Sequence, residues 1–240
     1  EGIENNPVMY ELLLELPWCP EKFTKEDWVE DYVKVRYGRD DSRLRQAWQI
    51  LSETVYNCPD IREGTVESVF CARPAEEVHS ASSWGSSRMY YEPEESKKAA
   101  KLMLSVADRY EGNNNFEYDL IDVVRQAIAD HGNRLQKEVT AAYRAGKKAD
   151  FERLSGEFLN LILVQDSLLT TRREFKVGNW IAQARKIGRT NDEKRLYEWN
   201  ARVQITTWGN RKAADEGGLR DYSHREWAGL LKDFYYPRWK

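Results

Sequence analysis

Cysteine and histidine are scarce in this sequence, with three of each among 240 residues. Three cysteines cannot all pair with one another, and three cysteines with three histidines at wide spacing do not form a zinc site. Cys58 and Cys71 flank a polar loop. If the parent protein is exported, these two could close a small ring worth about 3 kcal/mol. The alternative is three reduced and mostly buried thiols.

Long apolar runs, charge of one sign and repeats are also missing. The longest largely apolar stretch, near Leu159 to Val164, is far too short to span a bilayer. The 37 basic and 40 acidic residues are mixed along the chain, so there is no electrostatic footprint for nucleic acid or an anionic membrane. No phosphate-binding glycine motif and no Asn-x-Ser/Thr sequon occurs. The absence of a fixed-period repeat excludes a solenoid.

Histidine chemistry has little support. The Glu-x-x-His motif at Glu76 and His79 occurs once, whereas a carboxylate-bridged di-metal bundle needs two such motifs on core helices. His131 and His224 are isolated, and we interpret them as satisfied or exposed side chains. The sequence therefore predicts no metal site.

Aromatic residues, in contrast, are abundant, with nine Trp and thirteen Tyr in a chain that is 41% hydrophobic and 32% charged. A disordered chain would hold far fewer aromatics. The length allows one large domain or two small ones with a sizeable core. The chain begins at Glu1 rather than at a methionine, so we expect it to be a piece of something longer.

The opening segment predicts a helix from Pro7 to Trp18. Asn6 can cap exposed amides, and proline loses nothing at the first helical position. Val8, Leu12 and Leu16 recur at helical spacing, so we expect one broad apolar face that is buried.

The rest of the chain also shows mainly helical periodicity. The predicted helices cover residues 24–38, 42–55, 93–110, 116–145, 150–169, 177–187 and 190–206, with caps at Thr24, Ser42 and Asp150 and a last helix after a cap at Ser223. The two long helices, 116–145 and 150–169, are joined by a short connection and should be antiparallel neighbours. Helices without alternating strands predict an all-α fold.

Periodicity fails between residues 58 and 92, where prolines, glycines and serines cluster. We expect a long irregular loop there, with one short strand at Thr65 to Cys71. A loop of that length in a compact protein is usually functional or covers a neighbour.

Several motifs along the chain carry a resemblance to a known family. The opening Glu1-Gly2-Ile3, followed by Asn-Pro, a Tyr-Glu-Leu helix and a closing Trp18, resembles the segment that carries a catalytic glutamate in the α-N-acetylglucosaminidases of glycoside hydrolase family 89. Further matches keep the family's order: Trp28 to Gly38, Trp48 to Cys58, Tyr118 to Asp122, Trp180 to Arg185, Gln204 to Gly209, Asp221-Tyr222, Ala228 to Leu230 and Tyr235 to Trp239.

The resemblance implies a division of the chain. Residues 1–18 would be the last strand end and helix of a (β/α)₈ barrel, and residues 19–240 an all-α, multi-helix C-terminal domain. Glu1 would be the nucleophile of a retaining mechanism at the C-terminal end of a barrel strand. The family's acid/base glutamate lies upstream, outside this chain. The family uses no metal or organic cofactor, and the resemblance implies an exported protein.

A second informative stretch contains Trp208, Leu219 and Tyr222. A Trp and a Tyr on a glycine-bearing loop are suited to stacking on a sugar, with Leu219 as an apolar wall for an acetyl methyl. The alternative is a pair of core aromatics that closes a helix junction. The resemblance implies that these residues complete the pocket over the barrel, although the chain departs from its relatives at Asn210 to Gly217.

By resemblance, then, this is the C-terminal part of an exo-acting α-N-acetylglucosaminidase that hydrolyses terminal, non-reducing α-linked N-acetylglucosamine from glycosaminoglycan-type or other glycans. Its partners would be that glycan and the upstream catalytic barrel of the same enzyme. The alternative is a non-catalytic helical module that binds carbohydrate or another protein. The upstream sequence separates the two, because only the enzyme needs a barrel pattern and a second glutamate there.

Overall fold

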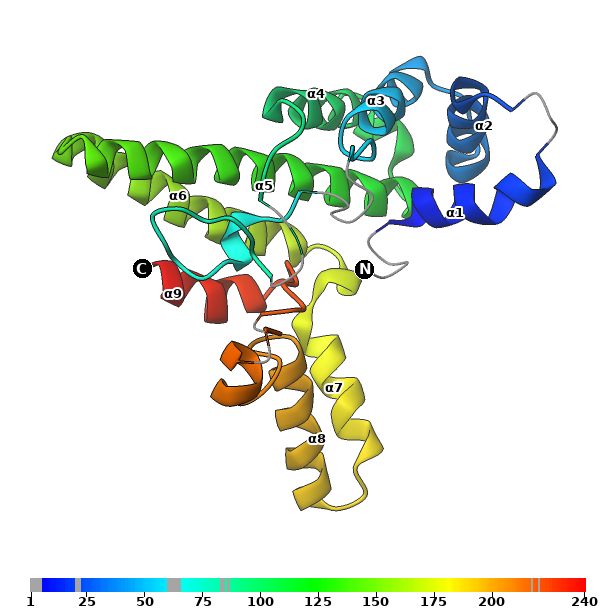
Figure 1. The fold of residues 1–240 in the computed structure, drawn as a ribbon. Helices are drawn as coiled ribbons and strands as arrows, with labels where there is room; N and C mark the ends of the chain where they lie inside the picture. The colour runs from blue at the N-terminus through cyan, green and yellow to red at the C-terminus, as the bar shows by residue number, and fades with distance from the viewer. Residues whose placement is uncertain are drawn as a thin grey trace.

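The structure is a computed structural model that describes residues 6–19, 23–59, 66–82, 85, 87–216, 218–219 and 221–240, without the side chain of residue 215. The described residues form helices joined by irregular segments, with no β-strand among them and one isolated bridge between Lys176 and Ala228. The α-helices in Figure 1 are α1 (Pro7–Glu15), α2 (Lys25–Tyr37), α3 (Ser42–Glu53), α4 (Pro93–Leu104), α5 (Asn114–Arg144), α6 (Lys148–Leu169), α7 (Val177–Ile187), α8 (Asn191–Gln204) and α9 (Tyr236–Trp239). The predicted all-α fold is confirmed.

Short 3₁₀ and π turns connect these helices. The 3₁₀ turns are η2 (Leu16–Trp18), η3 (Val69–Cys71), η4 (Ala107–Tyr110) and η5 (Arg173–Phe175), and the π turns are η6 (Lys212–Glu216) and η7 (Leu231–Tyr235). No helix within the described ranges is both long and apolar enough to cross a membrane.

The helix starts follow local capping chemistry, in part at other residues than predicted. The Thr24 hydroxyl accepts a hydrogen bond from the Asp27 amide at 3.1 Å, as expected. The third helix is capped by Asp41 rather than Ser42, because the Asp41 carboxylate accepts from the Arg43 amide at 2.9 Å. Asn6 makes no side-chain cap and uses its backbone carbonyl instead.

Two later caps were also predicted at the wrong residue. α6 begins at Lys148, so Asp150 lies inside the first turn. A carboxylate there still stabilises the helix through its interaction with the positive end of the helix dipole. Ser223 begins no helix. The chain stays irregular until η7, because Ala228 is bonded to residues Phe175 and Val177 and cannot enter a helix there.

The long helices α5 and α6 run side by side and form the spine of the molecule (Figure 1). α4 and α2 pack on the first half of α5, and α3 packs on α4 and α2. The buried side chains of these four helices form one hydrophobic cluster. The second half of α5, α6, η3 and the segments from α7 to α9 share a second cluster. α7 and α8 form a hairpin that projects away from the spine.

The irregular stretch after α3 is attached to α5 by η3. Thr65 lies outside the described residues, and the expected strand is wrong for the rest, since Val69–Cys71 is a buried 3₁₀ turn. The Phe70 ring fits against Gly132 of α5, where an added Cβ would lie 2.4 Å from the ring. The Asn133 side chain fixes the same turn, accepting from the Val69 amide at 2.7 Å and donating to the Glu67 carbonyl at 3.0 Å.

The opening helix α1 is less buried than its sequence predicts. Val8 is buried and Leu12 is half-buried against the first core cluster, but five large apolar side chains of α1 and η2 are exposed, namely Met9, Leu13, Leu14, Leu16 and Trp18. Polar contacts hold the opposite side, since Glu11 pairs with Arg36 at 2.9 Å and Glu15 accepts from the Trp28 indole at 2.6 Å. The expected buried face is therefore present at Val8 and Leu12 but not at Leu16, and the broad apolar face expected beside it is exposed.

The three cysteines all lie within the described residues. Cys71 is buried, Cys19 and Cys58 are half-buried, and no disulfide joins any two of them.

Candidate substrate-binding site

The structure brings together the three sequence-predicted pocket residues that it describes, whereas Glu1 lies outside the described residues. The rings of Trp208 and Tyr222 are tilted at 53° with their centroids 4.9 Å apart. The Tyr222 amide donates to the Leu219 carbonyl at 3.3 Å. Trp208 and Tyr222 remain 37% and 41% exposed, so this aromatic pair is not enclosed in the core of the described chain.

The backbone around this pair is unusual. Trp208 has φ 66°, Asp221 has φ 52° and His224 has φ 30°, and these are the non-glycine residues with positive φ in the described chain. Each such residue costs about 1 to 3 kcal/mol and persists only where its surroundings hold it. Such strain is common at ligand sites, and in the described chain it is confined to residues 208–224. This segment is therefore a candidate ligand site.

Asp221 anchors the loop that carries Tyr222. Its carboxylate is fully buried and accepts from Arg73 Nε at 2.7 Å and from Arg238 Nη2 at 2.9 Å. Arg73 comes from the irregular stretch after α3, and Arg238 comes from α9. A buried carboxylate with two guanidinium partners fixes the backbone position immediately before Tyr222.

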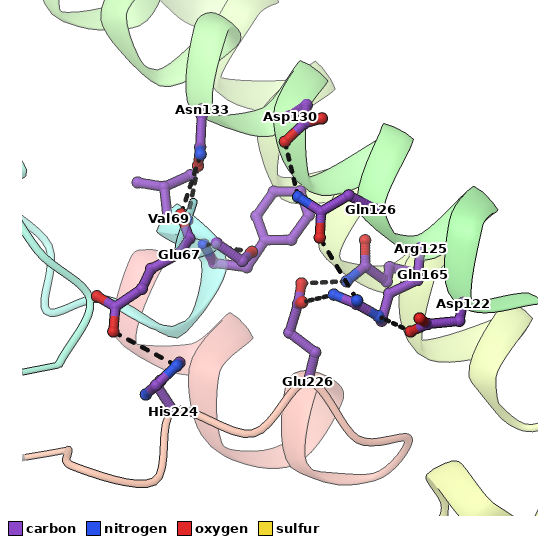
Figure 2. Close-up of polar contacts among 12 residues, drawn as sticks. Glu67, Val69, Asp122, Arg125, Gln126, Asp130, Asn133, Gln165, His224 and Glu226 are labelled. Atoms are coloured by element: carbon purple, nitrogen blue, oxygen red, sulfur yellow. Dashed lines mark hydrogen bonds and ion pairs between the residues drawn. The ribbon is translucent and has the colours of Figure 1, made fainter. Parts of the chain in front are cut away.

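Glu226 holds the other end of the loop. Figure 2 shows its carboxylate accepting from both Arg125 of α5 and Gln165 of α6. Arg125 also donates to Asp122 at 2.9 Å. Burial raises the pKa of the Asp122 carboxyl, and Arg125 opposes this rise. The loop is thus tied to the two helices of the spine.

His224 lies between the two anchors. Its Nδ1 is 3.1 Å from the Tyr222 carbonyl, and its Nε2 is 3.4 Å from Glu67 Oε1 (Figure 2). Glu67 is itself buried and accepts from the Ala81 and Ser82 amides at 2.8 and 3.0 Å. Both ring nitrogens of His224 therefore have a polar partner, consistent with the expectation of a satisfied histidine.

Sequence reasoning missed these anchors. Asp221 precedes the predicted Tyr222, and Asp122 and Arg125 lie in or beside a family motif. The sequence therefore drew these positions into the resemblance, but it did not predict that they anchor the loop. Arg73 and Glu226 lie on irregular segments, where no periodicity signals a partner. An ion pair between residues 148 positions apart, such as Arg73 and Asp221, has no local signature.

Metal chemistry has no support in the described part of the chain. No group of three or more histidine, cysteine, aspartate or glutamate side chains there could hold a metal ion. His79 of the Glu-x-x-His motif is exposed and lies near Glu77 instead.

Comparison with known proteins places this geometry in a family. The family model described as "Alpha-N-acetylglucosaminidase (NAGLU) C-terminal domain" matches residues 28–240. The Homo sapiens protein Alpha-N-acetylglucosaminidase is 30% identical over 243 residues, which cover 100% of this chain and 31% of the relative.

Solved structures agree with this match. The Family 89 Glycoside Hydrolase from Clostridium perfringens, in complex with PUGNAc, is 39% identical with a TM-score of 0.93. The match covers 98% of this chain and 27% of that one. The same fold and coverage are found for a variant of that hydrolase in complex with its substrate GlcNAc-alpha-1,4-galactose. The chain thus spans less than a third of its relatives' length, and it belongs to the α-N-acetylglucosaminidase C-terminal domain family of glycoside hydrolase family 89.

Proposed function

We propose that the chain is the C-terminal part of a retaining, exo-acting α-N-acetylglucosaminidase that removes terminal α-linked N-acetylglucosamine from glycans. The observation that carries this proposal is the half-exposed pair of Trp208 and Tyr222, on a loop that Asp221 and Glu226 anchor, in a chain of this family. An aromatic pair that only closed a core would be expected to be buried. A fixed and accessible pair is suited to the face of a sugar ring.

Glu1 supplies the nucleophile in this proposal. Its carboxylate attacks the anomeric carbon, the glycosidic bond breaks, and water later hydrolyses the glycosyl-enzyme ester. A second carboxyl about 5 Å away protonates the leaving oxygen and then takes a proton from the water. That second carboxyl lies upstream of this chain. Leu219 forms an apolar wall for the acetyl methyl group beside the aromatic pair.

The exposed side of α1 supports the proposed barrel partner. Leu13 and Leu14 are 61% and 66% exposed and Trp18 is 87% exposed, although they are large apolar side chains. A contiguous apolar surface of this kind marks an interaction site. The upstream barrel of the same enzyme covers it in our proposal, with residues 1–18 as the barrel edge and residues 19–240 as the helical domain.

The test is Glu1→Gln in the full-length enzyme, assayed on an aryl α-N-acetylglucosaminide. The substitution keeps shape and removes nucleophilicity, so kcat should fall by several orders of magnitude with the melting temperature nearly unchanged. Glu4→Gln, three residues along the same segment, is the matched control and should retain activity. Glu1→Ala with added azide should form a β-glycosyl azide, because azide then attacks from the nucleophile's side.

If Glu1→Gln keeps activity within about tenfold, roughly 1.4 kcal/mol of barrier, Glu1 is not the nucleophile. An equal loss in Glu4→Gln would mean that the segment is disturbed rather than the chemistry.

A further inference from the structure

A surface hollow lies where η5 meets the start of α7. It has a volume of about 370 Å³ and is lined by Arg173, Lys176, Asn179, Trp180, Gln183 and Trp227 beside Glu174. Asn179, Trp180 and Gln183 recur at spacings of three and four and share one side of α7, and Lys176 is the residue directly before that helix. We name it the α7 hollow; α7 itself projects from the spine in Figure 1.

The walls of the α7 hollow are held in place by the backbone. The Val177 amide donates to the Ala228 carbonyl at 3.2 Å, and the Ala228 amide donates to the Phe175 carbonyl at 2.8 Å. Trp227 is therefore fixed against the start of α7 although it lies about fifty positions away in sequence. The hollow needs little ordering when a ligand enters, and such preorganisation favours binding.

Two indole rings dominate the apolar part of the hollow. The centroids of Trp180 and Trp227 are 6.2 Å apart at 52°. The Trp180 indole nitrogen donates to the Ala201 carbonyl at 3.0 Å, which fixes the ring, yet Trp180 stays 38% exposed. The Asn179 amide nitrogen donates to the Arg173 carbonyl, so its Oδ1 remains as the acceptor for a hydroxyl. A fixed and accessible indole beside this oxygen and the Gln183 amide matches a sugar ring, with apolar faces and hydroxyl edges.

The charge of the hollow is positive. Among the described residues, Arg173 and Lys176 form no ion pair, whereas Glu174 is paired with Arg172 at 2.9 Å. Glu174 also lines the hollow, but its carboxylate is paired with Arg172, and the two cations Arg173 and Lys176 outnumber it. The hollow therefore keeps a net positive charge that suits an anionic group on the ligand.

We propose that the α7 hollow binds a sugar ring that carries an acidic group, carboxylate or sulfate, within the glycan on which the enzyme acts. The ring stacks on Trp180, its hydroxyls bond to Asn179 and Gln183, and its acidic group pairs with Arg173 and Lys176. The identity of the ligand as a glycan rests on the proposed function.

The test measures binding by calorimetric titration to the full-length enzyme. The probe is an oligosaccharide of alternating uronic acid and N-acetylglucosamine whose non-reducing end is the uronic acid, so that an exo-acting N-acetylglucosaminidase cannot shorten it. The double variant R173Q/K176Q should weaken binding by at least about tenfold, since two charge-assisted contacts are lost. A probe with sulfated and otherwise neutral sugars distinguishes the two sources of the acidic group.

Three controls make the result decisive. K186Q removes an exposed cation of the same helix outside the hollow and should leave the dissociation constant unchanged. W180A should weaken binding to every probe by about tenfold, whereas W180F, which keeps an aromatic face, should restore most of it. Melting temperatures show that each variant is folded.

Absence of saturable binding to the wild-type enzyme, an equal loss in K186Q, or full binding by W180A would each overturn the proposal. Hydrolysis of an aryl α-N-acetylglucosaminide by the same preparations tests the proposed function separately. Hydrolysis without probe binding refutes only the α7 hollow, and probe binding without hydrolysis refutes only the catalytic proposal.

Discussion

Trp208 adopts a left-handed backbone conformation that its side chain does not favour, and it is held there by one backbone bond from its amide to the Val203 carbonyl at 2.8 Å. The conformation turns the chain directly after α8 and places the indole against Tyr222. The backbone conformation of this one residue thus places the Trp208 ring beside the Tyr222 ring.

Trp208→Ala in the full-length enzyme should lower kcat/KM by about 30-fold to 1,000-fold, a few kcal/mol of transition-state binding, because a desolvated stacking ring is lost. Trp208→Phe should recover part of this loss. The check is steady-state kinetics together with thermal melting on both variants. A lower melting temperature with unchanged constants for the folded fraction would instead make Trp208 a structural aromatic.

The buried carboxyl of Asp130 has a perturbed pKa. Burial raises the pKa of its carboxyl to about 6, although Ser96, Gln126 and Tyr91 donate to it and oppose the rise. The Ser96 hydroxyl is also 3.0 Å from the Pro93 carbonyl, so the hydroxyl can donate there while the protonated carboxyl donates to it. The cluster therefore accommodates a neutral Asp130.

Because this folded-state pKa lies above the ordinary value of 3.8, the fold binds more protons than the unfolded chain between these two values. The contribution of Asp130 to the free energy of unfolding is therefore fully present below about pH 4 and is lost as pH rises towards about 6. This contribution corresponds to about 3 kcal/mol at most. Asp130→Asn should remove this part of the pH dependence. Denaturation of both proteins from pH 4 to 8 measures it, and parallel curves would contradict the assignment.

At the scale of elements, the contact between η3 and α5 depends on the absence of a side chain. Gly132 sits in the interior of α5, where glycine normally weakens a helix, yet the Phe70 ring occupies the place of its Cβ. This contact attaches the irregular stretch, and with it Arg73, to the spine.

Gly132→Ala should destabilise the protein by about 1 to 3 kcal/mol through overpacking against Phe70. Gly156 of α6 is the matched control, because its Cβ would meet nothing within 4 Å, and Gly156→Ala should stabilise by about 0.5 to 1 kcal/mol. Phe70→Leu combined with Gly132→Ala should show a favourable coupling in a double-mutant cycle. Additive losses would mean that Phe70 is not the obstacle.

The loop anchor at Asp221 is a second test at this scale. Asp221→Asn leaves two guanidinium groups facing a neutral amide, and we expect a loss of about 3 kcal/mol, with weaker substrate binding as Tyr222 loses its support. Asp233→Asn, an exposed carboxylate nearby, should change neither property. Melting temperature and KM are measured on both variants. An unchanged KM in Asp221→Asn would show that Asp221 does not support substrate binding.

Local signals predicted the helices well, because amphipathic spacing and caps such as Thr24 act within one or two turns. They failed at Ser42, because the neighbouring Asp41 is an equally good cap, and at Asp150, because α6 begins at Lys148 without any side-chain cap. They also failed at the strand expected before Cys71, where packing on α5 prevailed. The candidate pocket residues were chosen through the family resemblance. Their anchors Arg73 and Glu226 could not be, because partners distant in sequence have no pattern to detect.

At the scale of the whole molecule, the chain has a folded helical body and an apolar side of α1 that the described residues leave uncovered. Residues 1–240 alone should not hydrolyse an aryl α-N-acetylglucosaminide, because one carboxylate without its acid partner can neither protonate the leaving group nor activate water. Assay of the purified chain beside the full-length enzyme measures this. Robust turnover by the isolated chain would refute the division of the site between barrel and helical domain.

The anchor at Asp221 also bears on biosynthesis. Arg73 precedes it by 148 residues, whereas Arg238 follows 17 residues later. A ribosome therefore finishes α5 and α6 long before the second guanidinium exists, and the nascent loop carries a carboxylate with half of its counter-charge. A message truncated just before the Arg238 codon would therefore yield a helical body in which the Asp221 carboxylate, next to Tyr222, has Arg73 as its guanidinium partner and lacks Arg238.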